Sequence, residues 1–226
     1  MHRDEHAGEQ SLQEQRSLLS AESWNERYRD SDRVWSGRPN RRLVEQVADL
    51  SVGRALDVAC GEGGDAIWLA QQGWQVTAVD VSEVALDKLA RHAAQAGFED
   101  RVRIGLYDAL ADSRPAGPHQ FDLVTVSFLH VPIPDFVKIY RGIAEAVAPG
   151  GRLLVTAHHP MDVESGARTC HGHGLLFGPE RVLAALDVAD GGTWQVEVAE
   201  VQERVQESDE GPLQVGDTVV RLRRGV

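Results

Sequence analysis

Short runs of apolar and β-branched residues alternate with helical segments through the middle of this 226-residue chain. The apolar runs fall at residues 55–59, 75–79, 102–106, 123–128 and 152–157, and the helical segments at 65–72, 82–96 and near 135–147. Apolar strands joined by helices are typical of βαβ units, whose parallel sheet is covered on both faces. The pattern therefore predicts an α/β fold with a doubly wound, mostly parallel sheet.

The two ends of the chain differ in pattern from the middle. Residues 11–30 place a few large apolar side chains in a polar background, which predicts one or two short helices. Asn40 follows a turn and is expected to cap the next helix. Near the C-terminus, 194–205 and 215–222 predict two strands of a hairpin. We expect an N-terminal extension with a helical lid over residues 1–39 and one domain over 40–226.

Composition narrows the classes of partner. Thirty-five acidic against 23 basic residues give a net charge of −12, which disfavours nucleic acid. No uncharged apolar run approaches the ~18 residues of a membrane span, and Met1–His6 lacks the apolar region of a signal peptide. Two cysteines, Cys60 and Cys170, cannot form a disulfide framework. We expect a cytoplasmic monomer or homodimer with no membrane or nucleic-acid partner.

A Gly-rich segment at residues 55–65, Ala-Leu-Asp-Val-Ala-Cys-Gly-Glu-Gly-Gly-Asp, carries the clearest functional signal. Small residues between a strand and a helix let a ligand approach the backbone, beside the edge where open parallel sheets bind ligands. The spacing is close to a dinucleotide fingerprint, with Ala66 at its third glycine position, so a nicotinamide cofactor remains an alternative. A carboxylate from Asp57 pointing into the loop would repel a pyrophosphate and suit a cationic sulfonium nucleoside.

The pattern Asp57-x-Ala59-x-Gly61-x-Gly63 resembles motif I of the class I S-adenosylmethionine-dependent methyltransferases, with Ala59 in place of the family's first glycine. Residues 76–80 resemble the family's second strand, 107–109 its adenine-contacting turn and 121–127 its fourth strand. Residues 148–155 resemble the approach to its fifth strand, with a helix-to-strand turn expected at 149–151. The resemblance implies a seven-stranded sheet with an antiparallel last strand. It also implies S-adenosyl-L-methionine as cofactor and S-adenosyl-L-homocysteine as product. The cofactor-binding residues it implies are Asp57, Ala59, Cys60, Gly61, Gly63, Asp80, Val81, Asp108, Ala109 and Ser127.

Aromatic residues mark the N-terminal extension. Trp24 and Tyr28 share a helix face, and Trp35 precedes a turn that contains Arg38. They are either the packing side of a docked helix or a lid whose aromatic faces attract the sulfonium. The arrangement resembles the thiopurine, tellurite and halide methyltransferase group, with Tyr28 in place of a second Trp. This resemblance implies that Trp24, Tyr28 and Trp35 contact the cofactor, and we expect Arg38 on the substrate side.

His130 and His158 follow the expected ends of two strands, where acceptor pockets form in this architecture. Each is either a general base, worth ~10²–10⁴ in rate, or a residue of the pocket wall. No metal is expected, because the histidines and Cys170 lack zinc-ligand spacing. We predict methyl transfer to a sulfur, oxygen, nitrogen or chalcogen atom of a small-molecule acceptor. The alternatives are a nicotinamide-dependent oxidoreductase and a non-catalytic ligand-binding regulator.

Overall fold

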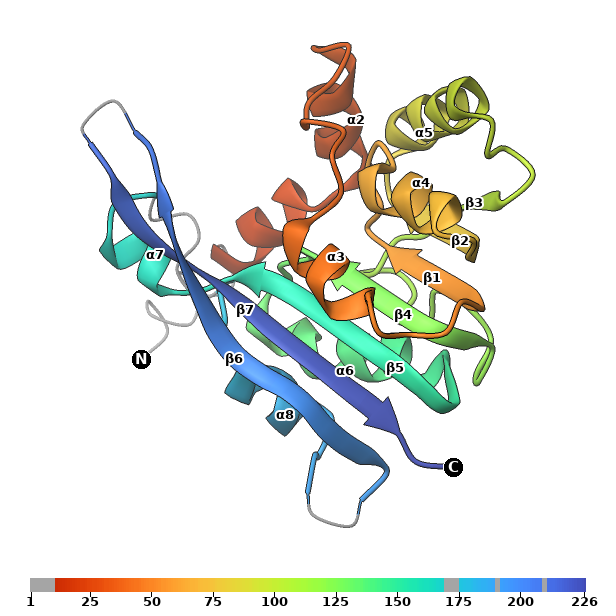
Figure 1. Cartoon of the computed structure of the whole chain (residues 1–226). Coiled ribbons are helices and arrows are strands. Elements are labelled where there is room, and N and C mark those ends of the chain that lie inside the picture. The colour runs from red at the N-terminus through yellow and green to blue at the C-terminus, as the bar shows by residue number, and fades with distance from the viewer. Residues whose placement is uncertain (1–10, 169–174, 190–191, 209–210) are drawn as a thin grey trace.

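A seven-stranded sheet in the order β3-β2-β1-β4-β5-β7-β6 forms the centre of the computed structural model (Figure 1). The structure describes residues 11–168, 175–189, 192–208 and 211–226. The strands are β1 Arg54–Val58, β2 Gln75–Asp80, β3 Val102–Leu106, β4 Phe121–Ser127, β5 Val147–His158, β6 Trp194–Gln206 and β7 Leu213–Arg224. β1 to β5 are parallel, and β7 is antiparallel to both β5 and β6. The predicted fold class is confirmed.

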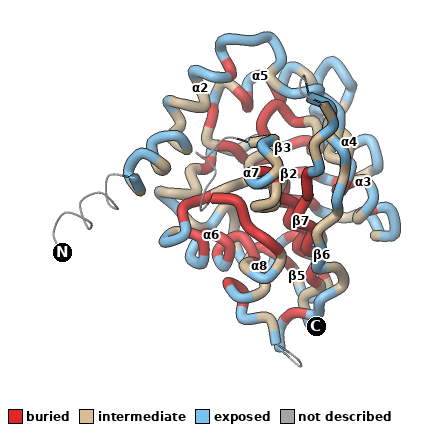
Figure 2. Tube along the Cα trace, turned by 90° about the vertical axis from the view of Figure 1, so that its left-hand side faces the viewer, coloured by how far each residue is buried: buried red, intermediate tan, exposed pale blue. Residues whose placement is uncertain are grey.

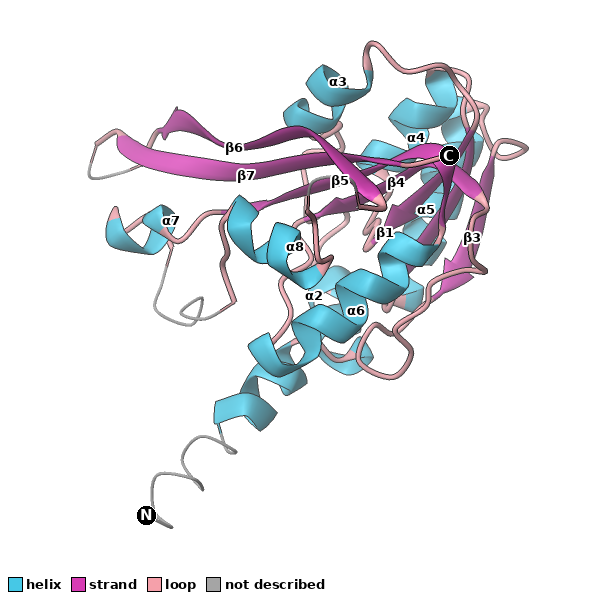
Figure 3. Ribbon diagram, turned by 90° about the horizontal axis from the view of Figure 1, so that it is seen from below, coloured by secondary structure: helices cyan, strands magenta, loops and turns pink. Residues whose placement is uncertain are grey.

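Helices cover both faces of this sheet. They are α2 Ala21–Arg29, α3 Arg41–Val47, α4 Gly64–Gln71, α5 Glu83–Ala96, α6 Ile133–Glu145, α7 Met161–Glu164 and α8 Pro179–Ala185, and residues 11–18 are helical as well. Consecutive strand residues enter opposite cores, as Leu123 and Val124 do, because side chains alternate along a strand. One core takes its helical residues from α3, α4 and α5, and the other from α6 and α8 (Figure 3).

The helix boundaries follow from capping side chains that the sequence indicates. Asn40 accepts a hydrogen bond from the backbone N–H of Arg42 and begins α3. Ser82 accepts from the N–H of Ala85 and begins α5, which ends at Gly97 in the left-handed conformation that glycine tolerates. These caps fix where β2 ends and α5 begins, so they position the loop at the carboxyl end of that strand.

One strand boundary differs from its prediction. We expected a turn at residues 149–151 before a strand at 152–157, whereas β5 begins at Val147. Phe121 pairs with Val147 and Leu123 with Arg152, so the Pro-Gly-Gly segment occupies an irregularity in the ladder. The turn chemistry is present, with Gly150 at a φ of +77°, but pairing with β4 has already begun before it. The short helix α7 was not predicted.

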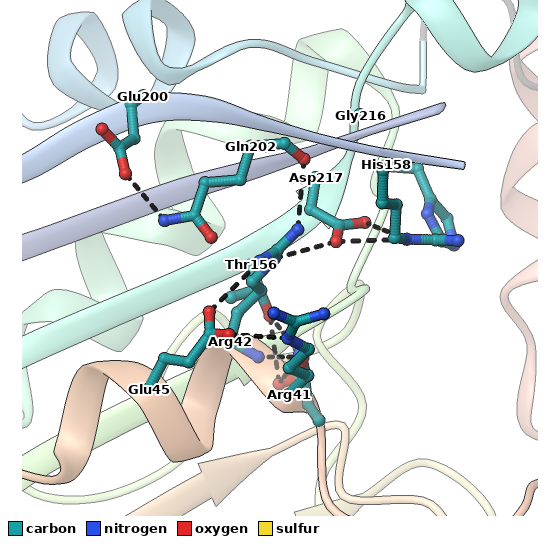
Figure 4. Close-up of polar contacts among 12 residues, drawn as sticks. Arg41, Arg42, Glu45, Thr156, His158, Glu200, Gln202, Gly216 and Asp217 are labelled. Atoms are coloured by element: carbon teal, nitrogen blue, oxygen red, sulfur yellow. Dashed lines mark hydrogen bonds and ion pairs between the residues drawn. The ribbon is translucent and has the colours of Figure 1, made fainter. Parts of the chain in front are cut away.

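A buried ion pair joins α3 to the C-terminal hairpin. Arg42, which is 6% exposed, places its Nε 3.0 Å from Oδ2 of Asp217 on β7 and reaches Glu45 and the Gln202 carbonyl as well (Figure 4). Buried residues concentrate in β5 and β7 behind this contact, whereas β6 forms the more exposed edge (Figure 2). The hairpin is thereby attached to the helix that precedes β1.

The N-terminal segment, residues 11–39, lies against α5 and the Gly-rich loop. Asn25 on α2 accepts a hydrogen bond of 2.7 Å from the Ser82 hydroxyl, and Arg16 forms an ion pair with Asp135 on α6. Tyr28 is 3% exposed. The segment therefore connects helices from both faces of the sheet across its carboxyl edge.

Candidate functional site

The carboxyl ends of the parallel strands open into a cavity of about 660 Å³, within the ~300–1,000 Å³ usual for ligand sites. All predicted site residues except Asp57 and Gly63 line it: Trp24, Tyr28, Trp35, Arg38, Ala59, Cys60, Gly61, Asp80, Val81, Asp108, Ala109, Ser127, His130 and His158. They come from the N-terminal segment and from the loops after β1 to β5. Open parallel sheets bind ligands at this edge.

The two glycines of the loop serve different contacts. A Cβ on Gly61 would lie 2.8 Å from Oη of Tyr28, so glycine allows the N-terminal segment to approach the loop. A Cβ on Gly63 would lie 2.0 Å from Cδ1 of Leu89, so this glycine allows the loop to pack on α5. Both residues have positive φ angles of +52° and +87°. Gly63 thus shapes the loop from behind and does not line the cavity.

Two residues without the freedom of glycine also adopt left-handed conformations at the cavity wall. Ala59 has a φ of +59°, and so does Phe128 at the end of β4. This conformation is unfavourable for a residue with a Cβ and is concentrated at functional sites. The backbone at Ala59 explains why a glycine is suited to this position in motif I.

Asp57 lies under the loop and does not face the cavity. It is 1% exposed, its carboxylate accepts a bond from the Ala66 backbone, and Oδ2 has no hydrogen-bond partner among the described residues. Burial, together with the nearby carboxylates of Asp65 and Asp80, raises its pKa well above the ordinary value. The Asp57 carboxylate therefore does not point into the loop as expected; it lies beneath the loop and bonds the backbone at the start of α4.

Asp80 ends β2 beside the loop. Oδ2 accepts a hydrogen bond of 2.8 Å from the Gly61 N–H, and Oδ1 accepts one of 2.9 Å from the Ser82 N–H. Burial raises its pKa. Each carboxylate oxygen has a second lone pair, so both keep acceptor capacity toward a ligand hydroxyl. Ser82 is the N-cap of α5, so Asp80 supports the turn without being the cap.

The loop after β3 places Asp108 and Tyr107 at another wall. Oδ1 of Asp108 accepts from the Leu110 N–H at 2.9 Å, as in an Asx turn. The Tyr107 hydroxyl is buried without a partner among the described residues, and burial raises its pKa. Asp108 thus stabilises the turn after β3 through Oδ1, while its second carboxylate oxygen can accept a hydrogen bond from a ligand in the cavity.

A polar network joins four elements at the wall of the cavity, which Asn40, Asp65 and Ser127 line. Asp65 accepts from the backbone N–H of Asn40 at 2.6 Å and from the Ser127 hydroxyl at 2.9 Å. The Asn40 amide donates to Thr156 at 2.8 Å, and Thr156 donates to Ser127. Burial raises the pKa of Asp65 against the opposing effect of these bonds. Sequence reasoning missed Asp65, although its place at the start of α4 next to the loop was a usable signal.

The aromatic residues of the N-terminal segment come together over Gly61. The rings of Trp24 and Tyr28 lie 5.8 Å apart, and Nε1 of Trp35 donates to Oη of Tyr28 at 3.0 Å. The Arg27 guanidinium lies 5.2 Å and 5.1 Å from the ring centres of Trp24 and Trp35. The three aromatic residues are thus brought together at one wall of the cavity.

The two histidines lie in an environment that does not suit a general base. Nε2 of His130 accepts from the His158 N–H, and the two rings stack 5.3 Å apart. Burial and then the Arg168 guanidinium lower the pKa of His130 to about 4 and that of His158 to about 2. Nδ1 of His158 lies 3.6 Å from Asp162, whose carboxylate bonds Arg168 instead. Both rings are neutral and weakly basic at pH 7, which favours the pocket-wall interpretation over general-base catalysis.

Cysteine and metal chemistry receive no support here. Burial and then the Asp80 and Asp57 carboxylates raise the pKa of the Cys60 thiol, which disfavours the nucleophilic thiolate. Within the described ranges, no three His, Cys, Asp or Glu side chains are grouped as a metal site would require. Cys170, His171 and His173 lie outside the described residues. In the same ranges, no helix has both the length and the apolar character for crossing a membrane.

Three further cavity residues were not singled out from the sequence. Phe128 stacks on His158 at 4.4 Å, Arg168 comes from the segment after α7, and Glu62 belongs to the Gly-rich loop itself. Glu62 had a signal, because a carboxylate between two loop glycines has an unusual position. Phe128 and Arg168 belong to loops without a motif.

Comparisons with known proteins agree with this architecture. Residues 55–151 match a family described as a methyltransferase domain. A ubiquinone biosynthesis O-methyltransferase of Idiomarina loihiensis is 30% identical over 164 residues, which are 65% of this chain and 65% of that protein. The chain aligns with less than half the length of several other curated relatives.

Solved structures share the fold at low identity. One, described for the conversion of a disulfide bond into a thioacetal group during echinomycin biosynthesis, has a TM-score of 0.68 at 21% identity and covers 91% of this chain and 92% of its own. TehB from Haemophilus influenzae has a TM-score of 0.65 at 18% identity, over 82% of this chain and 62% of its own. The motif, the sheet order and these matches agree with the class I S-adenosylmethionine-dependent methyltransferase family, to whose domain the chain is similar over residues 55–151.

Proposed function

We propose that this protein transfers a methyl group from S-adenosyl-L-methionine to a small-molecule acceptor. The observation that carries the proposal is the cavity at the carboxyl edge of the sheet. It is lined by the Gly-rich loop, by Asp80 and by the aromatic N-terminal segment, which lies over that loop. The family relationship favours this reaction over the nicotinamide-dependent alternative.

The residues of the cavity fit the cofactor. A Cβ on Gly64 would lie 2.9 Å from the Arg38 carbonyl, so glycine allows the turn at residues 37–38 to pack on the loop beside the cavity. Asp80 retains lone pairs that we assign to the two ribose hydroxyls, and residues 107–109 line the cavity and would hold the adenine ring. Trp24, Tyr28 and Trp35 offer aromatic faces to a sulfonium. We propose these roles for the cofactor-binding residues named from the sequence.

The cofactor supplies an electrophilic methyl group on a positively charged sulfur. A lone pair of the acceptor forms the new bond to the methyl carbon, the carbon–sulfur bond breaks, and its electron pair remains on the neutral sulfur of the product. Any acceptor proton leaves to solvent or to a base. Alignment and exclusion of water by the cavity walls can contribute ~7–11 kcal/mol to such a step.

The acceptor end of the cavity is apolar and aromatic, lined by Phe128, Leu129, Val131 and Leu175 beside the two histidines. We propose that the acceptor packs here, with Arg38 as a further residue of the substrate side. The similarity to ubiquinone O-methyltransferases favours an oxygen nucleophile, while sulfur, nitrogen and chalcogen acceptors remain within the proposal. Because His130 is hydrogen-bonded and weakly basic, we propose that neither histidine removes the acceptor proton.

The remaining expectations become part of this proposal. We propose a cytoplasmic monomer or homodimer, without nucleic-acid partners, with residues 1–39 as a lid and 40–226 as the methyltransferase domain. The contacts of Tyr28 and Trp35 with the loop support the division.

A screen of acceptor classes tests the proposal. Phenols, thiols, amines and tellurite would each be incubated with the protein and the methyl donor, and release of S-adenosyl-L-homocysteine measured. We expect release above the acceptor-free control for at least one class. Failure of every class, with a protein that binds the methyl donor, would favour a non-catalytic ligand-binding role.

A further inference from the structure

Glu62 lies between Gly61 and Gly63 of the loop, and its carboxylate accepts hydrogen bonds from the backbone of the N-terminal segment. Oε2 accepts hydrogen bonds of 3.0 Å from the backbone N–H groups of both Val34 and Trp35. Oε1 accepts a bond of 3.0 Å from Nζ of Lys88. Glu62 is 5% exposed. The residue therefore joins the loop to the backbone on which Trp35 is carried.

Lys88 completes this contact from α5. It is 5% exposed, and its ammonium donates to the Ser31 carbonyl as well as to Glu62. Nζ also lies 5.8 Å from the ring centre of Tyr28. The chain has only one other lysine, Lys138, which is exposed on α6. Lys88 thus contacts the N-terminal segment at two points and the loop at a third.

Burial makes the two partners depend on one another. Removing one of them leaves a buried charge without compensation, which is strongly unfavourable, whereas removing both leaves none. The groups that the pair orders are the backbone at residues 31–35 and the Tyr28 ring. They belong to the segment whose Tyr28 and Trp35 side chains contact Gly61.

We propose that Glu62 and Lys88 form a positioning pair that fastens the N-terminal segment over the Gly-rich loop and so completes the cofactor side of the cavity. The pair acts through Tyr28 and Trp35 and takes no part in the bond changes. The effect on cofactor affinity rests on the proposed function, while the effect on the order of the segment does not.

The test uses Glu62→Gln, Lys88→Met and the double variant, with Lys138→Met as the matched control. Hydrogen exchange is measured over residues 28–38, and the dissociation constant for S-adenosyl-L-homocysteine by calorimetry. For Lys88→Met we expect exchange at Val34 and Trp35 and the dissociation constant each to rise at least about tenfold. The double variant should fall short of the sum of the single effects, because it has no unpaired charge. Lys138→Met should match the wild type.

Unchanged exchange over residues 28–38 and unchanged affinity in folded variants would overturn the proposal. An increase in amide exchange that is as large in the sheet as in residues 28–38 would also overturn it, because it would mean that the pair only stabilises the fold. If the single variants fail to fold, exchange over residues 28–38 and affinity are compared between the double variant and the wild type. The Gln side chain keeps one oxygen acceptor for the Val34 and Trp35 N–H groups, so the double variant has no buried charge without a partner and is expected to fold. If the wild type does not bind the product, the proposed function fails, and the exchange over residues 28–38 alone decides the positioning role.

Discussion

Asp80 is the side chain from which we expect the largest single contribution to cofactor recognition. Asp80→Asn keeps the shape and one oxygen acceptor but removes the charge and the second acceptor. Hydrogen bonds to charged groups contribute ~1.5–3 kcal/mol, so affinity for S-adenosyl-L-homocysteine should fall about tenfold or more. Calorimetry would measure it, with Asp87→Asn on the exposed side of α5 as control. Wild-type affinity in a folded Asp80→Asn protein would remove Asp80 from the ribose site.

Ala59 permits a prediction about stability at the same loop. Its φ of +59° disfavours a residue with a Cβ by ~1–2 kcal/mol, whereas glycine adds ~0.4–1 kcal/mol of chain entropy to lose on folding. Ala59→Gly should therefore leave the free energy of unfolding unchanged or raise it by up to about 1.5 kcal/mol. Ala66→Gly, in α4, should lower it by about 1 kcal/mol. Urea denaturation of both variants compares them, and a clear loss for Ala59→Gly would contradict the strain at this residue.

His130 gives a dependence of stability on pH. Burial lowers its pKa from 6.5 to about 4, so the unfolded chain binds the proton first as the pH falls. Stability is therefore complete above pH 6.5 and is lost as the pH falls toward 4, by about 3 kcal/mol for a shift of this size. His130→Gln keeps an acceptor for the His158 N–H and should lose that much less between pH 6.5 and 4. Parallel curves for the two proteins would show that His130 is not the titrating group.

The sequence located the site residues better than their roles. Asp80, Gly61 and Ser127 follow strands whose ends meet at one edge, so their place could be predicted from the βαβ pattern. The burial of Asp57 could not, because it depends on how closely α4 packs on β1. Nor could the lowered pKa of His130, which comes from its burial and from the approach of Arg168, a residue 38 positions away in the chain.

Among the elements, the N-terminal segment either packs on the domain as a structural element or closes over the bound cofactor, and the two cases predict different results. If it closes over the cofactor, amide exchange across residues 11–38 should slow when S-adenosyl-L-homocysteine is added, while exchange in the sheet changes little. The structure alters the choice of variant, because Tyr28 is 3% exposed and Tyr28→Ala would also destabilise the core. Tyr28→Phe removes only the acceptor of the Trp35 N–H and should weaken product binding several-fold with little change in melting temperature.

The outcome that would contradict closure is specific. Identical exchange over residues 11–38 with and without the product, together with wild-type binding by Tyr28→Phe, would reduce the segment to packing. For the melting temperature, Tyr140→Phe is a suitable control, since its hydroxyl also makes one hydrogen bond, to the Leu129 carbonyl.

Elements with a strong local signal were predicted well. The strands at β1, β2 and β3 and the capped helix α5 follow from apolar runs and from Ser82 and Gly97. The start of β5 was mispredicted because pairing with β4 overrides the turn chemistry of Pro149 and Gly150. The helix α7 spans only four residues, too few to show a period.

At the scale of the whole molecule, the fold brings several buried carboxyl groups to one edge of the sheet. Asp57, Asp65 and Asp80 lie under or beside the cavity, and burial raises the pKa of each. A raised pKa means that burial works against the charged form of these groups, whereas the −12 net charge of the chain makes its surroundings negative. A cationic sulfonium nucleoside is favoured there over a pyrophosphate, because Asp65 and Asp80 line the cavity and Asp57 lies beneath the loop.

The measurement that tests this account most directly is calorimetric titration of the wild-type protein with S-adenosyl-L-homocysteine and, separately, with NAD. We predict binding of one product molecule per chain, with a dissociation constant of roughly 1 μM to 1 mM, and no detectable heat with NAD. Binding of NAD without binding of S-adenosyl-L-homocysteine would contradict the assignment of the cavity to the methyl donor.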